Sequence, residues 1–101
     1  MQILIRWVVD YMDDKTIKLY LQNLIGSVYK ILPMYDNEDP KLREYLDSLC
    51  IQLLGALENF SELKSSARYL SVINIIQYFR TNDFDKKTCK REVLKCTNLL
   101  D

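Results

Sequence analysis

Residues 66–101 read SARYLSVINIIQYFRTNDFDKKTCKREVLKCTNLLD, and this stretch decides the fold. Residues 67–80 are mostly apolar, residues 81–85 are polar around one phenylalanine, and residues 86–100 place apolar side chains at three-to-four spacing among lysines. That spacing is typical of one face of an α-helix. The stretch therefore predicts a helical hairpin, with an apolar helix over 67–80, a tight corner over 81–85 and a basic helix over 86–100.

The basic helix has an inward and an outward face. Asp83 or Asp85 can cap its first turn by accepting backbone N–H bonds. The inward positions are Cys89, Val93, Cys96 and Leu100, and the outward positions are Lys86, Lys87, Lys90, Arg91 and Lys95, opposed only by Glu92. A charge run is usually a solvated face, and the alternative is a positive surface for phosphates or lipid headgroups.

The apolar helix has more than one possible role. Between Tyr69 and Phe79, apolar side chains occupy most of the helix circumference, which exceeds a single core-facing stripe. Core packing is the ordinary explanation in a small domain. The alternative is a partner site formed together with Trp7 and Tyr11, because aromatic residues often anchor interfaces.

Helical periodicity continues N-terminal to the hairpin. Apolar residues recur at three-to-four spacing over 17–32, where Asp13 or Asp14 can cap the helix and Pro33 is expected to end it. Gly26 lies inside this helix at a cost of about 1 kcal/mol relative to alanine. We therefore expect it to mark a close helix crossing.

A longer helix is expected over residues 39–60. Asp39 and Pro40 supply an N-cap followed by proline at the first helical position. Ser61 interrupts the pattern, and the hairpin is expected to begin after a short corner near Ser65 and Ser66.

Residues 3–12, ILIRWVVDYM, are apolar almost throughout and too few to span a membrane. No other segment resembles a partner strand, so a short helix laid across the bundle, buried in the core or shared with a second subunit, is favoured. The chain, residues 1–101, is thus predicted to be a single all-α domain. The expected architecture is an antiparallel four-helix bundle, to which residues 3–12 could add a short N-terminal helix.

Composition narrows the function. Fourteen basic residues balance fourteen acidic ones, so nucleic acid is disfavoured as a partner of the whole molecule. Without histidine there is no catalytic triad or histidine metal ligand, and we expect neither an enzyme nor a cofactor or metal site. Three cysteines without a CxxC pair indicate buried, reduced thiols and a cytoplasmic location.

Residues 11–14 spell YMDD, the tetrapeptide of reverse-transcriptase active sites, where paired aspartates bind two metal ions. That motif sits between two apolar strands. Here the following residues, Lys15 to Lys18, open a helical pattern, and the chain is too short for a polymerase. A chance match, with Asp13 and Asp14 as helix caps, is the better interpretation.

Three pieces of the chain carry a family resemblance. They are NEDPKLREYL at residues 37–46, Ala67-Arg68 opening an apolar helix, and RTNDFD at residues 80–85 leading into a lysine-rich helix. In this layout, over about residues 21–100, the chain resembles the immunity proteins that lactic acid bacteria make against their own pediocin-like bacteriocins. The first fourteen residues are more hydrophobic than is usual in that family.

The resemblance implies a function without catalysis. Such proteins act in the cytosol of Gram-positive producers and block the pore formed when a bacteriocin engages its membrane permease, and their C-terminal hairpin is linked to recognition. The implied partner is thus a permease–bacteriocin complex, with peripheral membrane contact also open. The candidate partner-binding residues are Arg80, Asn82, Phe84, Lys86, Lys87, Lys90, Arg91 and Lys95.

Two alternatives remain. The chain also resembles, more faintly, the small helical-bundle proteins that accompany diversity-generating reverse transcriptases and bind nucleic acid, although those are typically strongly basic. The other alternative is a phage or mobile-element helical adaptor that forms a homodimer through residues 1–12.

Overall fold

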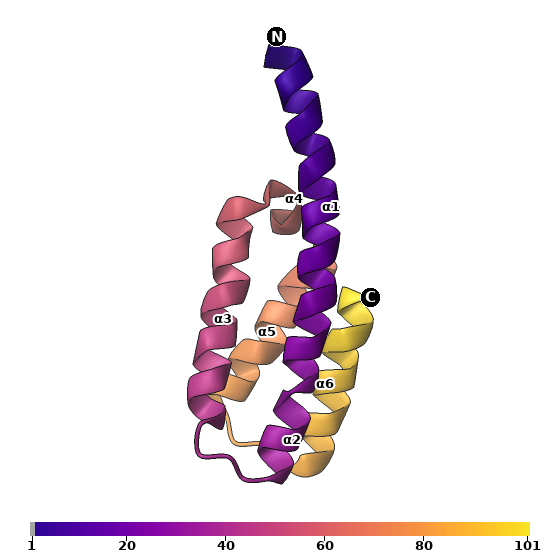
Figure 1. Cartoon of the computed structure of the whole chain (residues 1–101). Coiled ribbons are helices and arrows are strands. Elements are labelled where there is room, and N and C mark those ends of the chain that lie inside the picture. The colour runs from indigo at the N-terminus through magenta and orange to yellow at the C-terminus, as the bar shows by residue number, and fades with distance from the viewer. Residues whose placement is uncertain (1) are drawn as a thin grey trace.

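The computed structural model describes the backbone of residues 2–101 and the side chains of residues 15–101. Over this part of the chain the protein is all-α, without strands, as predicted. The helices, labelled in Figure 1, are α1 (Gln2–Tyr29), α2 (Ile31–Asp36), α3 (Leu42–Asn59), α4 (Ser61–Lys64), α5 (Ala67–Thr81) and α6 (Lys86–Leu100).

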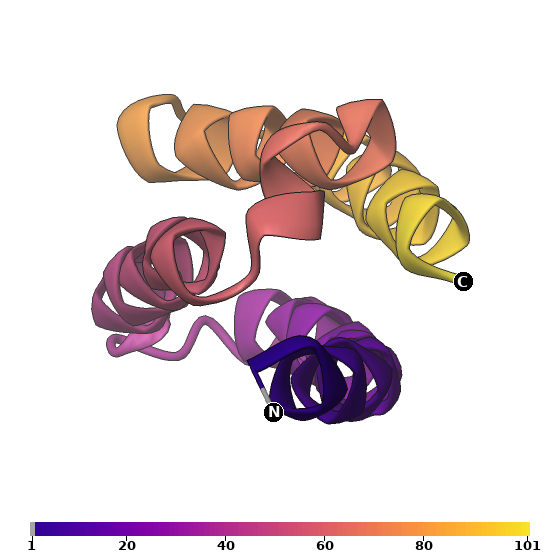
Figure 2. The ribbon, with the colours of Figure 1, turned by 90° about the horizontal axis from the view of Figure 1, so that it is seen from above.

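The long helices are arranged so that α3 packs on α5, α5 on α6, and α6 on α1. Figure 2, a view along the helices, places α3 and α6 at opposite corners of the assembly. The N-terminal part of α1 extends past the ends of the other helices (Figure 1). The packed body is therefore built by the C-terminal half of α1 with α2 to α6.

The helical hairpin has the bounds that the sequence predicts, to within one residue. α5 runs to Thr81, and α6 covers Lys86–Leu100. Ser66 caps α5, since its side chain accepts a hydrogen bond of 3.2 Å from the backbone N–H of Tyr69. Asp85, rather than Asp83, caps α6 by accepting a 2.7 Å bond from the N–H of Thr88. These two caps fix where each helix begins.

The predicted break at Asp13 and Asp14 is wrong, because α1 is one helix from Gln2 to Tyr29. Mid-helix aspartates cost only some tenths of a kcal/mol each, whereas ending one helix and starting another leaves orphan N–H and C=O groups on both sides. Residues 3–12 thus continue α1 instead of forming a separate short helix, and residues 11–14 lie within it, away from any strand hairpin. Whether residues 1–12 are core or dimer interface depends on side chains outside those described.

The end of the first helix differs from the prediction as well. α1 stops at Tyr29, and Pro33 lies inside the following short helix α2, at its third residue. Proline has no N–H to donate to the carbonyl of Tyr29 and its ring clashes with that carbonyl, so α1 ends at Tyr29, four residues before Pro33. Within the first turn of α2 the missing N–H costs nothing.

Gly26 does not mark a close helix crossing. It is exposed, and a Cβ built on it meets no atom within 4 Å. The prediction is wrong because the neighbouring positions on α1, Leu24 and Val28, carry the contacts to the core instead. Gly26 is therefore a helix residue without a packing role.

We expect Gly26→Ala to raise the free energy of unfolding by about 0.5–1 kcal/mol, since alanine loses less backbone entropy in a helix and has room here. Urea unfolding of the two proteins measures the difference. The same substitution at Gly55, which also lies in a helix with no atom within 4 Å of its Cβ, is the matched control and should stabilise similarly. A destabilised Gly26→Ala beside a stabilised Gly55→Ala would contradict the assignment.

α3 begins slightly later than predicted. Asp39 and Pro40 form the turn before it, in which the Asp39 carboxylate accepts a 2.8 Å bond from the N–H of Lys41, and the helix proper starts at Leu42. It ends at Asn59, and the single turn α4 fills the expected corner before Ser66.

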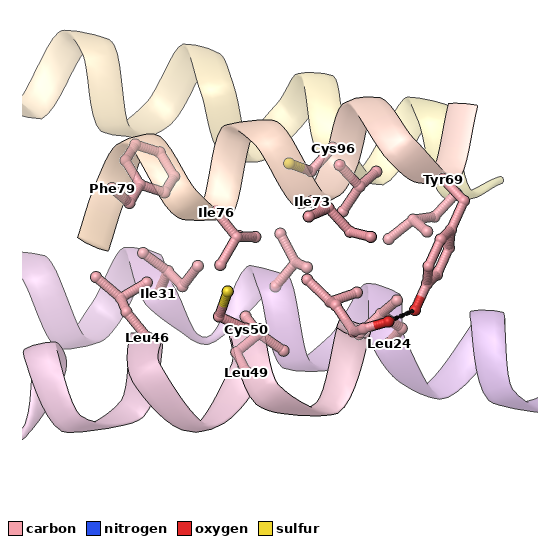
Figure 3. Packing of buried hydrophobic residues seen from close by; sticks show 14 of the residues in the cluster. Leu24, Ile31, Leu46, Leu49, Cys50, Tyr69, Ile73, Ile76, Phe79 and Cys96 are labelled. Atoms are coloured by element: carbon pink, nitrogen blue, oxygen red, sulfur yellow. Dashed lines mark hydrogen bonds between the residues drawn. The ribbon is translucent and has the colours of Figure 1, made fainter. Parts of the chain in front are cut away.

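A continuous apolar core joins the helices (Figure 3). It confirms core packing for one face of α5, where Tyr69, Val72, Ile73, Ile76 and Phe79 are buried. All three cysteines are buried free thiols, as predicted. The inward positions predicted for α6 are buried too. The proposed contribution of Trp7 and Tyr11 to a partner site lies outside the described side chains.

One buried polar group is paired within this core. The Tyr69 hydroxyl donates a 2.7 Å bond to the carbonyl of Leu53 and lies 2.9 Å from the hydroxyl of Tyr20. Burial raises the pKa of Tyr69 well above its ordinary value, and the neighbouring Tyr20 hydroxyl adds to the effect. The bonds tie α5 to α3 and α1, and they satisfy a hydroxyl that would otherwise be costly to bury.

Candidate functional site

The corner between α5 and α6 is held by aromatic packing. The ring of Phe84 lies 4.6 Å from that of Phe79 and 5.2 Å from that of Tyr35, measured between centroids. The Tyr35 hydroxyl also donates a 2.9 Å hydrogen bond to the carbonyl of Phe84. Phe84 thus anchors the corner to α2, and its ring is half-buried rather than free for a partner.

Arg80 is tied to α3. Its Nε donates a 2.7 Å bond to Oδ1 of Asp47, and Nη1 lies 3.7 Å from the sulfur of Cys50. The bond to Asp47 raises the pKa of Arg80 above its ordinary value. Arg43 donates to the Arg80 carbonyl across 3.4 Å. Arg80 therefore links α5 to α3, with its guanidinium already engaged.

Asn82 closes the end of α5. Its side-chain amide donates to the carbonyl of Tyr78 at 3.2 Å and to the hydroxyl of Thr81 at 3.1 Å. Asn82 is exposed, and the next residue, Asp83, is exposed beside it. Polar groups thus line the outer edge of the corner.

An open groove lies between this corner and the start of α3. Its volume is about 460 Å³. The buried side chains Leu46 and Phe79 contribute to its floor, with the half-buried Leu42 and Phe84 beside them, while Arg43, Asn82, Asp83 and Asp39 supply polar groups. We call this the corner groove. It combines an apolar floor with a polar rim, the arrangement by which a pocket holds one apolar group and orients it.

The cations of α6 do not line the corner groove. Lys86 reaches back to Asp36 across 3.7 Å, and Arg91 lies 3.8 Å from its neighbour Glu92. Lys87, Lys90 and Lys95 are exposed and have no ion-pair partner within the described side chains. The eight predicted residues therefore separate into two groups, the corner residues Arg80, Asn82 and Phe84, and the cations of α6.

Three residues of the site were missed by sequence reasoning: Tyr35, Arg43 and Asp47. Each meets the corner from a segment more than 30 residues away, so no local spacing could indicate the pairing. The one available signal was that all three flank the predicted start of the long helix, where Arg43 already belonged to a piece of the family resemblance.

No group of three or more cysteine, aspartate or glutamate side chains in residues 15–101 is placed to bind a metal ion. Of the helices described, none has the length and hydropathy of a membrane-spanning segment. Comparisons with protein-family models, with curated proteins and with solved structures find no match.

Proposed function

We propose that this chain is a bacteriocin immunity protein of the pediocin-like group. In this proposal it acts without catalysis, in the cytoplasm, by contacting the bacteriocin–permease complex from the cytosolic side. The observation that carries the proposal is the corner groove, because it is lined in part by the corner of the C-terminal hairpin, which the family resemblance links to recognition. Its polar rim includes Asn82 from the predicted set.

The fold that goes with this function is an antiparallel four-helix bundle. The alternating direction of α1, α3, α5 and α6 along the molecule supports it (Figure 1). So does the pairing of helices close in sequence, α3 with α5 and α5 with α6. Such bundles present short connecting corners at their ends, where a partner can reach them.

The corner groove suits a protein partner better than a free small molecule. Its volume is within the range of ligand pockets, but it is shallow and open, so a small ligand would keep much of its surface in water. A side chain that belongs to a larger partner would bury more of its surface in the groove, because the partner's other contacts around the rim exclude water from it. Arg43 and Asn82 can then hydrogen-bond to the partner's backbone or carboxylate groups.

The test is protection of a sensitive lactic acid bacterium that expresses the chain, challenged with a panel of pediocin-like bacteriocins. We expect the wild-type chain to protect against at least one member. Asn82→Arg, which places a long charged side chain at the corner groove, is expected to reduce protection at least tenfold in inhibitory concentration, the size of effect typical for blocking an interface anchor.

The matched control is Asn74→Arg, the same substitution at an exposed position of α5 that does not line the corner groove. It should protect like the wild type, and circular dichroism of both purified variants checks that the helices are intact. Failure of the wild-type chain against the whole panel would overturn the immunity function. Equal protection by both variants would move the contact away from the corner groove.

A further inference from the structure

Charge is unevenly distributed along the chain although the total is zero. Residues 35–62, which include α3, carry seven carboxylates and two cations, whereas residues 66–100, which include α5 and α6, carry seven cations and three carboxylates. The two segments meet at the pairs Lys86–Asp36 and Arg80–Asp47, but α3 and α6 themselves lie at opposite corners of the assembly (Figure 2). α3 carries three carboxylates and one cation, whereas α6 carries five cations and one carboxylate.

The basic side is concentrated on the exposed surface of α6. Lys87, Lys90, Arg91 and Lys95 lie within about two turns and follow three-to-four spacing, with Leu94 among them and 40% exposed. We call these five residues the α6 outer face. A solvent-exposed leucine surrounded by long cationic side chains is typical of surfaces that bind lipid membranes.

Within residues 15–101, carboxylates oppose only one cation of the α6 outer face, Arg91, which interacts with Asp85 and Glu92. Glu92, the one carboxylate of α6, has a side chain only 21% exposed, and its Oε2 is buried. Among the described side chains, Lys87, Lys90 and Lys95 have no ion-pair partner, and the 3.8 Å pair between Arg91 and Glu92 is a weak one. At one end Arg68 adds a further cation, since its Nη2 donates a 2.7 Å bond to the carbonyl of Asn98.

We propose that the α6 outer face binds the anionic headgroups of a lipid membrane. Four or more cations on one helix, close to an anionic leaflet, match its surface potential, and the acidic α3 side would then face away from the lipid. Leu94 reaches the boundary between headgroups and acyl chains. The face has no aromatic side chain on which a base could stack, which disfavours single-stranded nucleic acid. This inference does not rest on the immunity function.

Sedimentation with vesicles tests it on the full-length protein. At low salt we expect binding to vesicles of phosphatidylglycerol and phosphatidylcholine, none to pure phosphatidylcholine, and loss of binding as salt screens the charges. Each lysine near an anionic surface strengthens binding about fivefold. The triple variant Lys87→Gln/Lys90→Gln/Lys95→Gln should therefore bind roughly 100-fold more weakly.

The matched control is Lys15→Gln/Lys41→Gln/Lys64→Gln, which changes the net charge by the same amount at three exposed positions outside α6. It should bind within about twofold of the wild type. If both triple variants lost the same amount of vesicle binding, the effect would come from net charge alone, and the proposal would be overturned. Wild-type protein that ignores anionic vesicles at low salt, or that binds structured RNA instead of them, would overturn it as well. The vesicle result is independent of bacteriocin protection, so either proposal can fail alone.

Discussion

Phe79→Ala is expected to lower the free energy of unfolding by about 3–5 kcal/mol, the usual cost of truncating a fully buried aromatic side chain. Phe79 is 1% exposed and packs against the ring of Phe84 at 4.6 Å. Its loss opens a cavity beneath the corner groove and frees the aromatic packing that holds the corner. The free energy of unfolding of a whole domain of this size is about 5–15 kcal/mol, so the variant would be only marginally folded.

Urea unfolding followed by circular dichroism measures this loss, and the neighbouring residue provides the control. Tyr78 has a side chain of similar size on the same turn of α5 but is 42% exposed. Tyr78→Ala should therefore lower the free energy of unfolding by about 1 kcal/mol or less. Comparable losses at the two positions would mean that the core does not lie on the face of α5 described above.

Raising the pH from 7 to 10 is expected to lower the free energy of unfolding by about 3 kcal/mol through Cys89 and Cys96. Burial raises the pKa of the Cys89 thiol to about 11 and that of Cys96 to about 12, from an ordinary value of 9.0. Asp36 adds to the first shift and Glu92 to the second. Both thiols therefore stay protonated in the folded chain at pH 10.

The direction follows from proton binding. Above pH 9 the unfolded chain has lost both thiol protons while the folded chain still holds them, so alkali favours unfolding. At pH 10, about one unit above the ordinary value, each thiol accounts for about 1.4 kcal/mol. The stabilisation is complete below pH 9 and is lost as the pH rises through 11 and 12.

Urea unfolding under reducing conditions at pH 7 and pH 10 checks the effect in the wild type and in Cys89→Ala/Cys96→Ala. The double variant is less stable at both pH values because it loses packing, but its drop between them should be about 3 kcal/mol smaller. A drop as large as that of the wild type would assign the alkaline sensitivity to tyrosines or lysines instead.

Local sequence signals were sufficient for the hairpin. Asp85, one of the two caps that the sequence offered for α6, accepts a bond from the N–H of Thr88, and Ser66, which caps α5, lies at the corner where the hairpin was expected to begin. The buried positions of α6 also follow directly from their spacing. The residue spacing thus located both helices, while the choice between Asp83 and Asp85 as the cap came from the structure.

The errors occurred where two local signals competed. Asp13 and Asp14 are good caps, but α1 continues through them because continuation leaves fewer backbone groups unpaired. Pro33 correctly indicated a helix end, yet its effect falls on the residue four positions earlier, at the break before α2. Gly26 indicated close packing and has none, since glycine also occurs in a helix by tolerance alone.

Only part of the candidate site could be predicted from the sequence. The cations of α6 could be found by spacing, and they are exposed as expected. The corner groove could not, because it requires Leu42 and Leu46 from α3 to meet Phe79 and Phe84 from the hairpin. The sequence also does not show which polar residues pair with one another, as Arg80 does with Asp47, because such pairs depend on the same long-range packing.

The pairing of α1 with α6 has a consequence for the order in which the molecule assembles. The pairings of α3 with α5 and of α5 with α6 join segments near one another in the chain, but α1 packs on a helix whose residues are synthesised some 70 positions later. Closing so long a loop costs more entropy than forming the hairpins. During synthesis, α3 and α5 can therefore pair early. The apolar side of α1 can pack on α6 only after α6 has left the ribosome.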